Sequence, residues 1–304
     1  MKDNPKVSVV INNYNYGRFL QEAIDSALNQ TYPHTEAIVV DDGSTDNSRE
    51  IIASYGDKII PVLKENGGQA SAFNAGFAAS KGDIICFLDS DDVFVPEKVA
   101  EIVAAFSDRT ELGWCFHSLK WVEADGKTSI QKDLPESSPG EYDLRDHIKK
   151  GNLKDKLPSL PSTSGLCFKR SLLQQILPMP EAKTISLNDA YLDYTSIGMS
   201  KGMILHKELA LYRIHGANAY TTSKDKQKLV QAKILIVTGY WVRVKYPSLS
   251  KFTNKLVAGG MGLFWRRGGI EPEYGEFVQK YLALVAPLEK LEINARAIYY
   301  CLTL

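Results

Sequence analysis

Two short acidic clusters are the parts of this 304-residue chain best suited to chemistry. The first is the run DDGSTD at 41–46, and the second is the run DSDD at 89–92. Carboxylates this close together repel one another unless water or a cation compensates them, and their hard oxygen atoms suit Mg²⁺ or Mn²⁺ with a phosphate completing the coordination. A single acidic turn is equally typical of a solvated loop with helix caps. The pairing of two such clusters therefore favours a metal-phosphate site.

The segments around these clusters alternate between strand patterns and helix patterns. The expected elements are strands at 6–12, 36–40, 58–63 and 83–88, and helices at 18–29, 49–55, 69–80 and from Pro96 onward. Such alternation predicts a mainly parallel sheet that is covered by helices on both faces. Because ligands bind at the carboxyl ends of parallel strands, we expect the polar residues that follow the strands to share one edge of the sheet.

The second half of the chain is less regular. The expected elements are strands at 112–118, 121–123, 165–170 and 208–214, and helices at 172–176, 189–199, 225–245 and 273–296. A stretch rich in Pro, Ser and Lys at 131–164 is long for a connection, so we predict a lid or an acceptor loop there.

The composition excludes several classes of protein. Apolar residues make up 44% of the chain and charged residues 24%, which is typical of a globular protein. Lys plus Arg equals Asp plus Glu at 36 each, so there is no basic field for nucleic acid or an anionic membrane. The first residues lack an apolar signal core, no run of eighteen apolar residues occurs, and the four cysteines lack metal-ligand spacing. We therefore expect a cytoplasmic protein with reduced cysteines.

The motifs resemble those of glycosyltransferase family 2, the inverting nucleotide-sugar transferases that have the GT-A fold. The resemblance runs through VSVVINNYN, SALNQTY, AIVVDDGSTDNS, ENGGQASAFNAGFAASKGD and ICFLDSDDVFVPE, in the family's order and spacing. It implies an α/β GT-A catalytic domain at 1–220, with a nucleotide-binding half at 1–105 and an acceptor half at 106–220. A C-terminal helical extension at 221–304 would follow.

The resemblance also implies where the donor nucleotide binds. The base would stack on Tyr14 and donate a hydrogen bond to the Asp42 carboxylate, next to Asn13. Gly67 and Gly68 would let the backbone approach the nucleotide, although a flexible turn before a helix explains them equally well. Uridine is the base that the family favours, and guanosine and thymidine remain open.

The DSDD run resembles the family's Asp-any-Asp signature, in which one carboxylate meets the ribose and another binds the metal that bridges the phosphates. Its register stays open: Asp91 or Asp92 would hold Mn²⁺ or Mg²⁺, and Asp89 or Asp91 would meet the ribose. The run LYRIHG resembles the family's closing motif. It implies that His215 completes the metal site and that Arg213 approaches the diphosphate.

The run SLNDAYL resembles the segment in which the family keeps its catalytic base. Asp189 would take the proton of the acceptor hydroxyl while its oxygen attacks the anomeric carbon, and Asn188 stands where many relatives have Glu. A carboxylate at a helix start is also stabilised by the helix dipole, which is the structural alternative. Glu181, Asp193 and Glu208 are the competing acidic residues.

Two weaker motifs concern the acceptor and the membrane. Ser164 and Gly165 fall where family members shape the acceptor pocket. The run FWRR at 264–267 lacks the Gln-any-any-Arg-Trp order of processive synthases, so we predict transfer of a single sugar. We interpret this run as an amphipathic helix end, with a transient peripheral membrane contact as the alternative.

Other functions fit the sequence less well. A nicotinamide dehydrogenase would need a Gly-any-Gly-any-any-Gly turn after the first strand, where this chain has NNYNYG. A nucleotidyltransferase would need a Gly-rich basic loop there. The alternative that stays open is a non-catalytic nucleotide-sugar-binding protein of the same fold.

We predict an inverting, metal-dependent transferase that moves one sugar to a glycan or lipid-linked glycan. The preferred donor is a UDP-sugar, and the expected location is the cytoplasm or the inner face of the membrane. Nucleic acid is not an expected partner, and the oligomeric state stays open.

Overall fold

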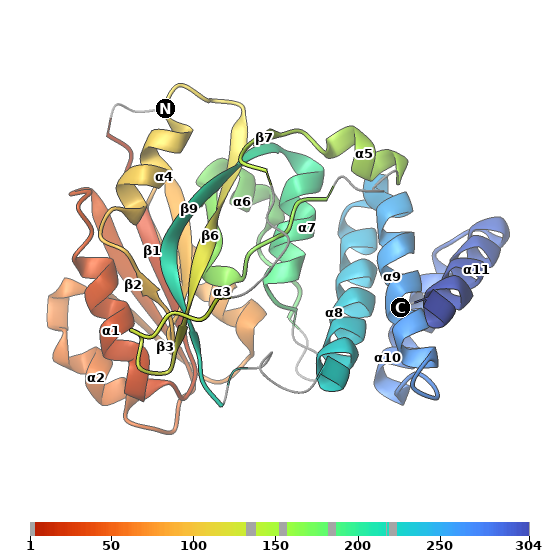
Figure 1. Ribbon diagram of the computed structural model, residues 1–304, viewed down its shortest axis with the longest axis horizontal. Helices are drawn as coiled ribbons and strands as arrows, with labels where there is room; N and C mark the ends of the chain where they lie inside the picture. Colours follow the sequence, from red (N-terminus) through yellow and green to blue (C-terminus); the bar gives the residue numbers. More distant parts are fainter. Residues whose placement is uncertain are drawn as a thin grey trace. The chain divides into compact units, whose positions relative to one another are not determined.

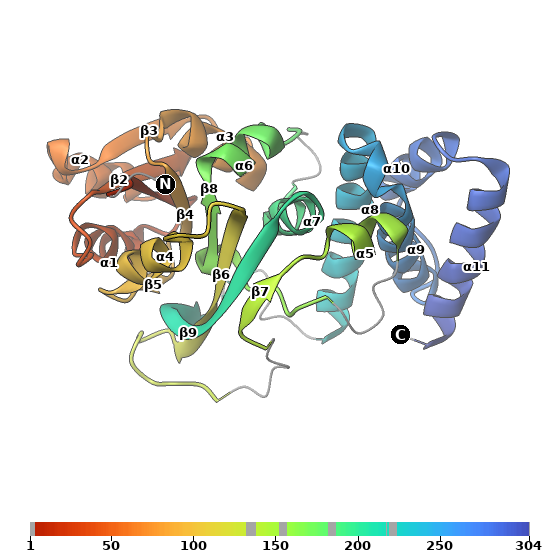
Figure 2. The same ribbon diagram turned by 90° about the horizontal axis from the view of Figure 1, so that it is seen from above.

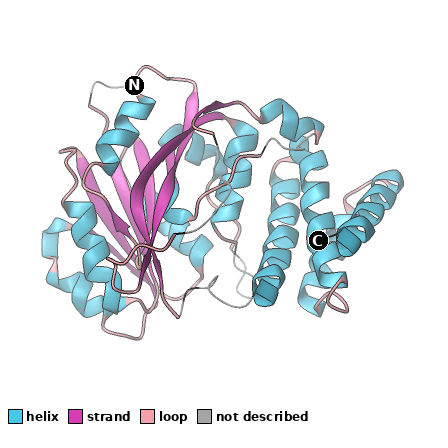
Figure 3. Cartoon of the chain, viewed as in Figure 1, coloured by secondary structure: helices cyan, strands magenta, loops and turns pink. Residues whose placement is uncertain are grey.

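The structure is a computed structural model that describes residues 4–131, 138–151, 157–181, 187–216, 218 and 224–303. The chain divides into two compact units, which are discontinuous in sequence. Unit 1 comprises Met1–Asp143, Pro158–Asp189 and Met199–His215, and unit 2 comprises Leu144–Leu157, Ala190–Gly198 and Gly216–Leu304. All strands of the described residues belong to unit 1, whereas unit 2 is helical (Figures 1 and 3). The domain boundaries predicted at 105 and 220 remain predictions.

Unit 1 contains one nine-stranded sheet with the order β3-β2-β1-β4-β8-β6-β9-β5, and β7 pairs with β9. The strands are β1 Val7–Asn13, β2 Thr35–Asp42, β3 Ile60–Lys64, β4 Ile84–Asp89, β5 Val93–Phe94, β6 Leu112–Glu123, β7 Gly140–Tyr142, β8 Leu166–Lys169 and β9 Lys201–Ile214. The first four strands pair in parallel, as predicted, and so do β6 and β9. Strands β5, β7 and β8 run antiparallel to their neighbours, so the sheet is mixed.

Helices cover both faces of this sheet. They are α1 Gly17–Leu28, α2 Ser48–Ser54, α3 Gln69–Ala79, α4 Lys98–Phe106 and α6 Arg170–Ile176. Helices α1 and α4 lie on one face of the sheet (Figure 2). Val9 and Ile11 share one apolar core with residues of these two helices. Val10 points to the opposite face, where a Cβ on Gly76 of α3 would lie only 2.3 Å from its Cγ1. The predicted α/β architecture is thereby confirmed.

Two strands are longer than their sequence patterns predict. The runs predicted at 112–118 and 121–123 form a single strand, β6, whose register with β9 shifts around Ser118. Strand β9 begins at Lys201 and not at residue 208, because the exposed polar residues 206–208 interrupt the apolar pattern without ending the strand. Cys86, Cys115 and Cys167 lie directly opposite one another on β4, β6 and β8 as free, buried thiols, in agreement with the prediction of reduced cysteines.

Unit 2 is built mainly around α8 Lys224–Lys245, α9 Ser250–Trp265, α10 Pro272–Ala283 and α11 Pro287–Thr303, with α5 Arg145–Lys150 and most of α7 Asp189–Met199. The prediction of one helix at 273–296 is wrong, because α10 ends at Ala283 and a second helix, α11, begins at Pro287. The run FWRR was interpreted as a helix end, and α9 does end there, but no helix was predicted over the glycines of α9, which have low helix propensity. Tertiary packing explains them: a Cβ on Gly260 would lie 2.8 Å from the Ala232 carbonyl oxygen of α8, and one on Gly262 would lie 2.7 Å from the Ala297 carbonyl oxygen of α11.

Part of the stretch predicted as a lid or acceptor loop is ordered into short elements. Strand β7 and helix α5 lie within 131–164, and a 3₁₀ turn at Thr163–Gly165 begins at its end, whereas 132–137 and 152–156 lie outside the described residues. Among the helices of the described residues, none has both the length and the apolar character needed to cross a bilayer.

Candidate functional site

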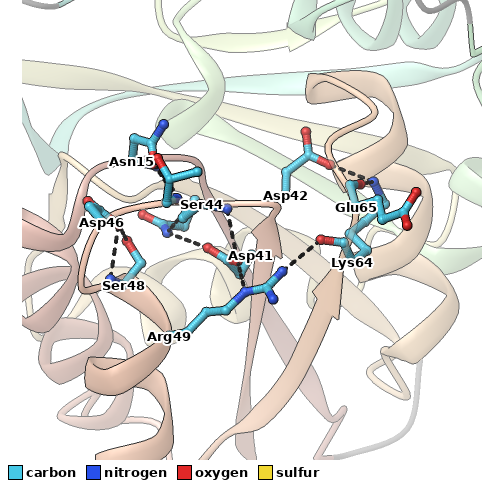
Figure 4. Close-up of polar contacts among 11 residues, drawn as sticks. Asn15, Asp41, Asp42, Ser44, Asp46, Ser48, Arg49, Lys64 and Glu65 are labelled. Atoms are coloured by element: carbon cyan, nitrogen blue, oxygen red, sulfur yellow. Dashed lines mark hydrogen bonds and ion pairs between the residues drawn. The ribbon is translucent and has the colours of Figure 1, made fainter.

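Asp41 joins the loops that follow β1 and β2. Its buried carboxylate accepts hydrogen bonds from Asn13 Nδ2 at 3.0 Å, from Arg49 Nε at 2.9 Å and from the Ser44 backbone N–H at 3.2 Å (Figure 4). Burial alone would raise the pKa of Asp41, but these hydrogen bonds outweigh it and hold the pKa below its usual value. Asn13, a predicted nucleotide contact, thus lies at the site and uses its amide nitrogen to hold the loop.

Asp42 contacts the glycine turn that precedes α3. Its Oδ1 accepts from Lys64 Nζ at 2.5 Å (Figure 4). Oδ1 also accepts from the Gly67 N–H at 3.0 Å, and Oδ2 accepts from the Gly68 N–H at 2.7 Å. The turn requires glycine at Gly68, whose φ is +81°. Three predicted nucleotide-binding residues therefore come together, and Lys64 joins them as a residue that the sequence analysis missed.

Tyr14 presents an exposed ring on a fixed loop. Its side chain is 47% exposed. The next residue, Asn15, has a left-handed backbone with φ of +58°. The Asn15 N–H donates to Ser44 Oγ at 2.9 Å, and Asn15 Oδ1 accepts from the Thr45 N–H at 2.7 Å (Figure 4). These bonds tie the Tyr14 loop to the acidic loop after β2, so the ring is available for stacking at a defined place.

The DSDD run begins at the carboxyl end of β4, next to β1. Asp92 is buried, and its two oxygens accept from Ser164 Oγ at 2.6 Å and from the Arg213 N–H at 3.0 Å. Burial, followed by the charges of neighbouring carboxylates, raises the pKa of both Asp89 and Asp92 well above the usual value for Asp. Joint ionisation of these carboxyl groups is therefore unfavourable by itself, and a bound cation would stabilise their charged forms.

His215 contacts this cluster from the end of β9. Its Nε2 lies 3.0 Å from Asp91 Oδ2, and its Nδ1 lies 3.2 Å from Nη2 of Arg18. Because a guanidinium can only donate, Nδ1 accepts and Nε2 carries the proton that is donated to Asp91. The rings of Tyr16 and Phe19 hold the imidazole, at centroid distances of 5.4 and 4.8 Å. A cation on Nε2 would move the ring proton to Nδ1, so Arg18 would have to withdraw.

A 3₁₀ turn, Thr163–Gly165, contacts three predicted site residues. Asp189 Oδ2 accepts from the Thr163 N–H at 3.2 Å and from the Thr163 hydroxyl at 3.3 Å. The hydroxyl of the next residue, Ser164, accepts from the Asp89 backbone N–H at 3.2 Å and donates to the Asp92 carboxylate. The turn thus brings Asp189 to the acidic cluster. Sequence reasoning assigned Ser164 and Gly165 only to the acceptor pocket and missed Thr163 altogether.

Arg213 directs its guanidinium to another part of unit 1. Its Nη2 lies 2.5 Å from Glu22 Oε2 on α1, and the guanidinium stacks over the Phe19 ring at 4.6 Å. Its backbone N–H, in contrast, supports Asp92. Arg18, which was not predicted, is the cation whose guanidinium contacts His215 at the acidic cluster.

The competing acidic residues lie elsewhere. Glu181 accepts from Asn74 Nδ2 at 2.8 Å, and Glu208 is exposed on β9. Asp193 is buried within α7 and belongs to unit 2. Asp189 begins α7, as the sequence predicted, and among these four it is the residue that contacts the Thr163 turn. The run FWRR lies at the end of α9, where Arg267 pairs with Asp225 at 2.8 Å.

Comparison with known sequences identifies relatives of this arrangement. The model of the family described as "Glycosyl transferase family 2" matches residues 8–176. An uncharacterized glycosyltransferase from Nostoc sp. is 38% identical over 232 residues, which make up 75% of this chain and 70% of that protein. The matched family region contains the loops after β1, β2 and β4 as well as the Thr163 turn.

Solved structures share the fold at low sequence identity. A crystal structure of S. aureus TarS 1-349 in complex with UDP-GlcNAc has a TM-score of 0.63 and 20% identity, covering 97% of this chain and 89% of that one. The mannosyltransferase PcManGT from Pyrobaculum calidifontis, in complex with GDP-Man and Mn²⁺, has a TM-score of 0.57 and 16% identity. The match covers 99% of this chain and 87% of that one. These likenesses establish the GT-A fold.

Proposed function

Because this chain belongs to glycosyl transferase family 2 and is a glycosyltransferase, we propose that it moves a single sugar from a nucleoside diphosphate sugar to an acceptor hydroxyl with inversion. The acceptor would be a glycan or a lipid-linked glycan. The observation that carries this proposal is the Thr163–Gly165 turn, because its Ser164 hydroxyl contacts Asp89 and Asp92 on the donor side and its Thr163 contacts Asp189 on the acceptor side. A base within one short turn of the donor site suits a direct displacement.

The Asp42 carboxylate has room to accept one more hydrogen bond, as from a nucleobase with a single N–H donor. A carboxylate has about four lone-pair positions. Lys64, Gly67 and Gly68 use three of them, which leaves one on Oδ2. The N3–H of uracil fits that position while its ring stacks on Tyr14. We therefore favour UDP as the nucleotide.

The donor atoms around Asp91 suit Mn²⁺ or Mg²⁺. Two adjacent ligands of an octahedral ion, each at about 2.1 Å, lie about 3 Å apart, and Asp91 Oδ2 lies 3.0 Å from His215 Nε2. No group of three or more His, Cys, Asp or Glu side chains suited to a metal occurs in the described part of the chain, so diphosphate oxygens and water would complete the shell. When bound, the cation would act as a Lewis acid that stabilises charge on the leaving diphosphate.

The other steps would each depend on particular residues of the chain. Asp91 and His215 would hold the cation, and Asp92 would keep the ends of β4 and β9 together through the Arg213 N–H. Asp189 would take the proton of the acceptor hydroxyl on a carboxylate oxygen. Thr163 would orient that carboxylate, because its N–H and hydroxyl both contact Oδ2.

The test is turnover of nucleotide-sugars by Asp189→Asn and by a matched control, Glu181→Gln. UDP-, GDP- and TDP-sugars are first compared for nucleoside diphosphate release with Mn²⁺ and with a chelator. On the best donor, Asp189→Asn should lower acceptor-dependent turnover about a hundredfold and leave donor affinity unchanged. Glu181→Gln should behave as the wild type. Near-normal turnover by Asp189→Asn would show that Asp189 is not the general base. Release of nucleoside diphosphate at the same rate with Mn²⁺ and with the chelator would show that the reaction needs no cation.

A further inference from the structure

Helix α11 carries an apolar stripe that the described chain leaves exposed. Leu288 is 79% exposed, Leu291 68%, Ile298 54% and Leu302 78%. The opposite face of the helix is buried, and Gly262 of α9 lets the α11 backbone approach closely. Large exposed apolar patches mark interaction surfaces in soluble proteins. The outer face of α11 is therefore a candidate binding surface.

The spacing of the stripe is that of a coiled-coil seam. Its members follow one another at intervals of three, four, three and four residues, and they are Leu288, Leu291, Ala295, Ile298 and Leu302. This is the a/d pattern of a heptad repeat, which presents one narrow apolar face to another helix. A broader stripe would be expected for a helix that packs on a globular core.

We propose that this stripe binds the same stripe of a second copy of the chain, with the two helices antiparallel. The stripe reads nearly the same in both directions from Ala295, because Leu288 and Leu302 each lie seven residues away and Leu291 and Ile298 lie four and three away. A two-fold interface requires this kind of self-complementarity. The small Ala295 at the centre lets the two helices approach closely.

Charge on the helix agrees with a second copy as the occupant. Glu289 and Glu292 balance Lys290 and Arg296, so the helix has no excess charge to attract anionic lipid or a charged peptide. Antiparallel alignment about Ala295 sets Leu291 opposite Tyr299 of the second copy, where the ring adds apolar area to the interface. Tyr299 is 62% exposed and accessible for this contact.

Analytical ultracentrifugation of the full chain tests self-association. The wild type should sediment at twice the mass of the chain, and the double variant Leu288→Glu, Leu302→Glu should sediment as a monomer. Val244→Glu is the matched control, because Val244 is an exposed apolar residue of α8 outside the stripe, and it should remain a dimer. A monomeric wild type at tens of micromolar, or a control that dissociates equally, would overturn the proposal.

Cross-linking tests the orientation and remains informative if the double variant fails to fold. In a Cys301→Ser background, Leu288→Cys mixed with Leu302→Cys should form a disulfide between the two chains, whereas each variant alone should not. Ala295→Cys should cross-link with itself, since the helices meet there. Self-cross-linking of Leu288→Cys alone would indicate parallel helices and contradict the proposal. Binding to neutral or anionic vesicles without self-association would assign the stripe to a membrane and overturn it.

Discussion

The imidazole of His215 lies 3.0 Å from the carboxylate of Asp91, although 124 residues separate them in the chain. β4 ends two residues before Asp91, and β9 ends directly before His215. β8 and β6 lie between these strands in the sheet, so the contact depends on how the second half of unit 1 adds to the first. The same arrangement gives Asp91 and Asp92 different environments, which can be separated by mutation.

Asp91→Asn should weaken metal-dependent binding of UDP at least tenfold, because a neutral amide is a poorer ligand for a hard cation. Asp92→Asn should leave the metal dependence within threefold of the wild type, since both Asp92 oxygens are engaged by Ser164 and Arg213. Calorimetry with and without Mn²⁺ separates the two variants. A larger loss of metal dependence in Asp92→Asn would assign the cation to Asp92.

Thr163→Val should lower kcat about tenfold while the KM for the donor changes less than threefold. The substitution keeps the shape of the side chain and removes the hydroxyl that contacts Asp189. Misorientation of a general base costs about one to two orders of magnitude in rate. Thr163→Ser restores the hydroxyl and should recover most of kcat in steady-state assays. Equal losses in both variants would show that the hydroxyl does not position the base.

Tyr14→Ala should weaken free UDP and the UDP-sugar by the same factor, about fivefold, because aromatic stacking contributes about 1 kcal/mol. The exposed ring lies on a loop held by Asn15, so its loss should leave the fold unchanged. Tyr14→Phe keeps the ring and should bind normally in the same titration. A loss confined to the sugar-bearing ligand would show that the ring contacts the sugar and not the base.

Asp41→Asn should lower the free energy of unfolding by about 2 kcal/mol at pH 7, because a buried carboxylate with charge-assisted hydrogen bonds is lost. The folded pKa of Asp41 lies below its usual value, so its stabilisation is present above about pH 4 and is lost as the pH falls through the folded pKa. The difference between variant and wild type should therefore shrink below pH 4 in urea titrations. Exposed Asp57→Asn is the control, and a difference that stays constant with pH would contradict the role of the Asp41 charge.

The parallel half of the sheet could be predicted because its strands are continuous apolar runs between helical stripes. Seven consecutive buried residues form β1, and the stripe of α1 faces the core as its spacing predicts. Strands β5 and β7 are two and three residues long, too short to show any period. Only the end of α9, at the run FWRR, was predicted as helical. Its glycine-containing part was not predicted, because those glycines are explained by the close approach of two neighbouring helices, which no local pattern reveals.

The candidate site shows the same limit. Asp42, Gly67 and Gly68 could be predicted because each follows a strand or begins a helix, and the structure brings them into contact. Thr163 and Arg18 could not be predicted, because a threonine in a loop and an arginine in a first helical turn are common residues. They acquire a role only when the strand order brings Thr163 to Asp189 and Arg18 to His215.

The close packing of α8 and α11 on the backbone of α9 joins the three helices into one cooperative unit. Any side chain at Gly260 or Gly262 would push a neighbouring helix away, so neither neighbour can loosen without exposing α9. The amide hydrogens along α9 should therefore exchange with solvent only when the whole helical unit opens. The outer ends of α8 and α11 should exchange earlier, by local fraying. Gly260→Ala or Gly262→Ala should abolish this contrast and let all three helices exchange at similar rates, whereas Gly259→Ala, where a Cβ has room, should preserve it.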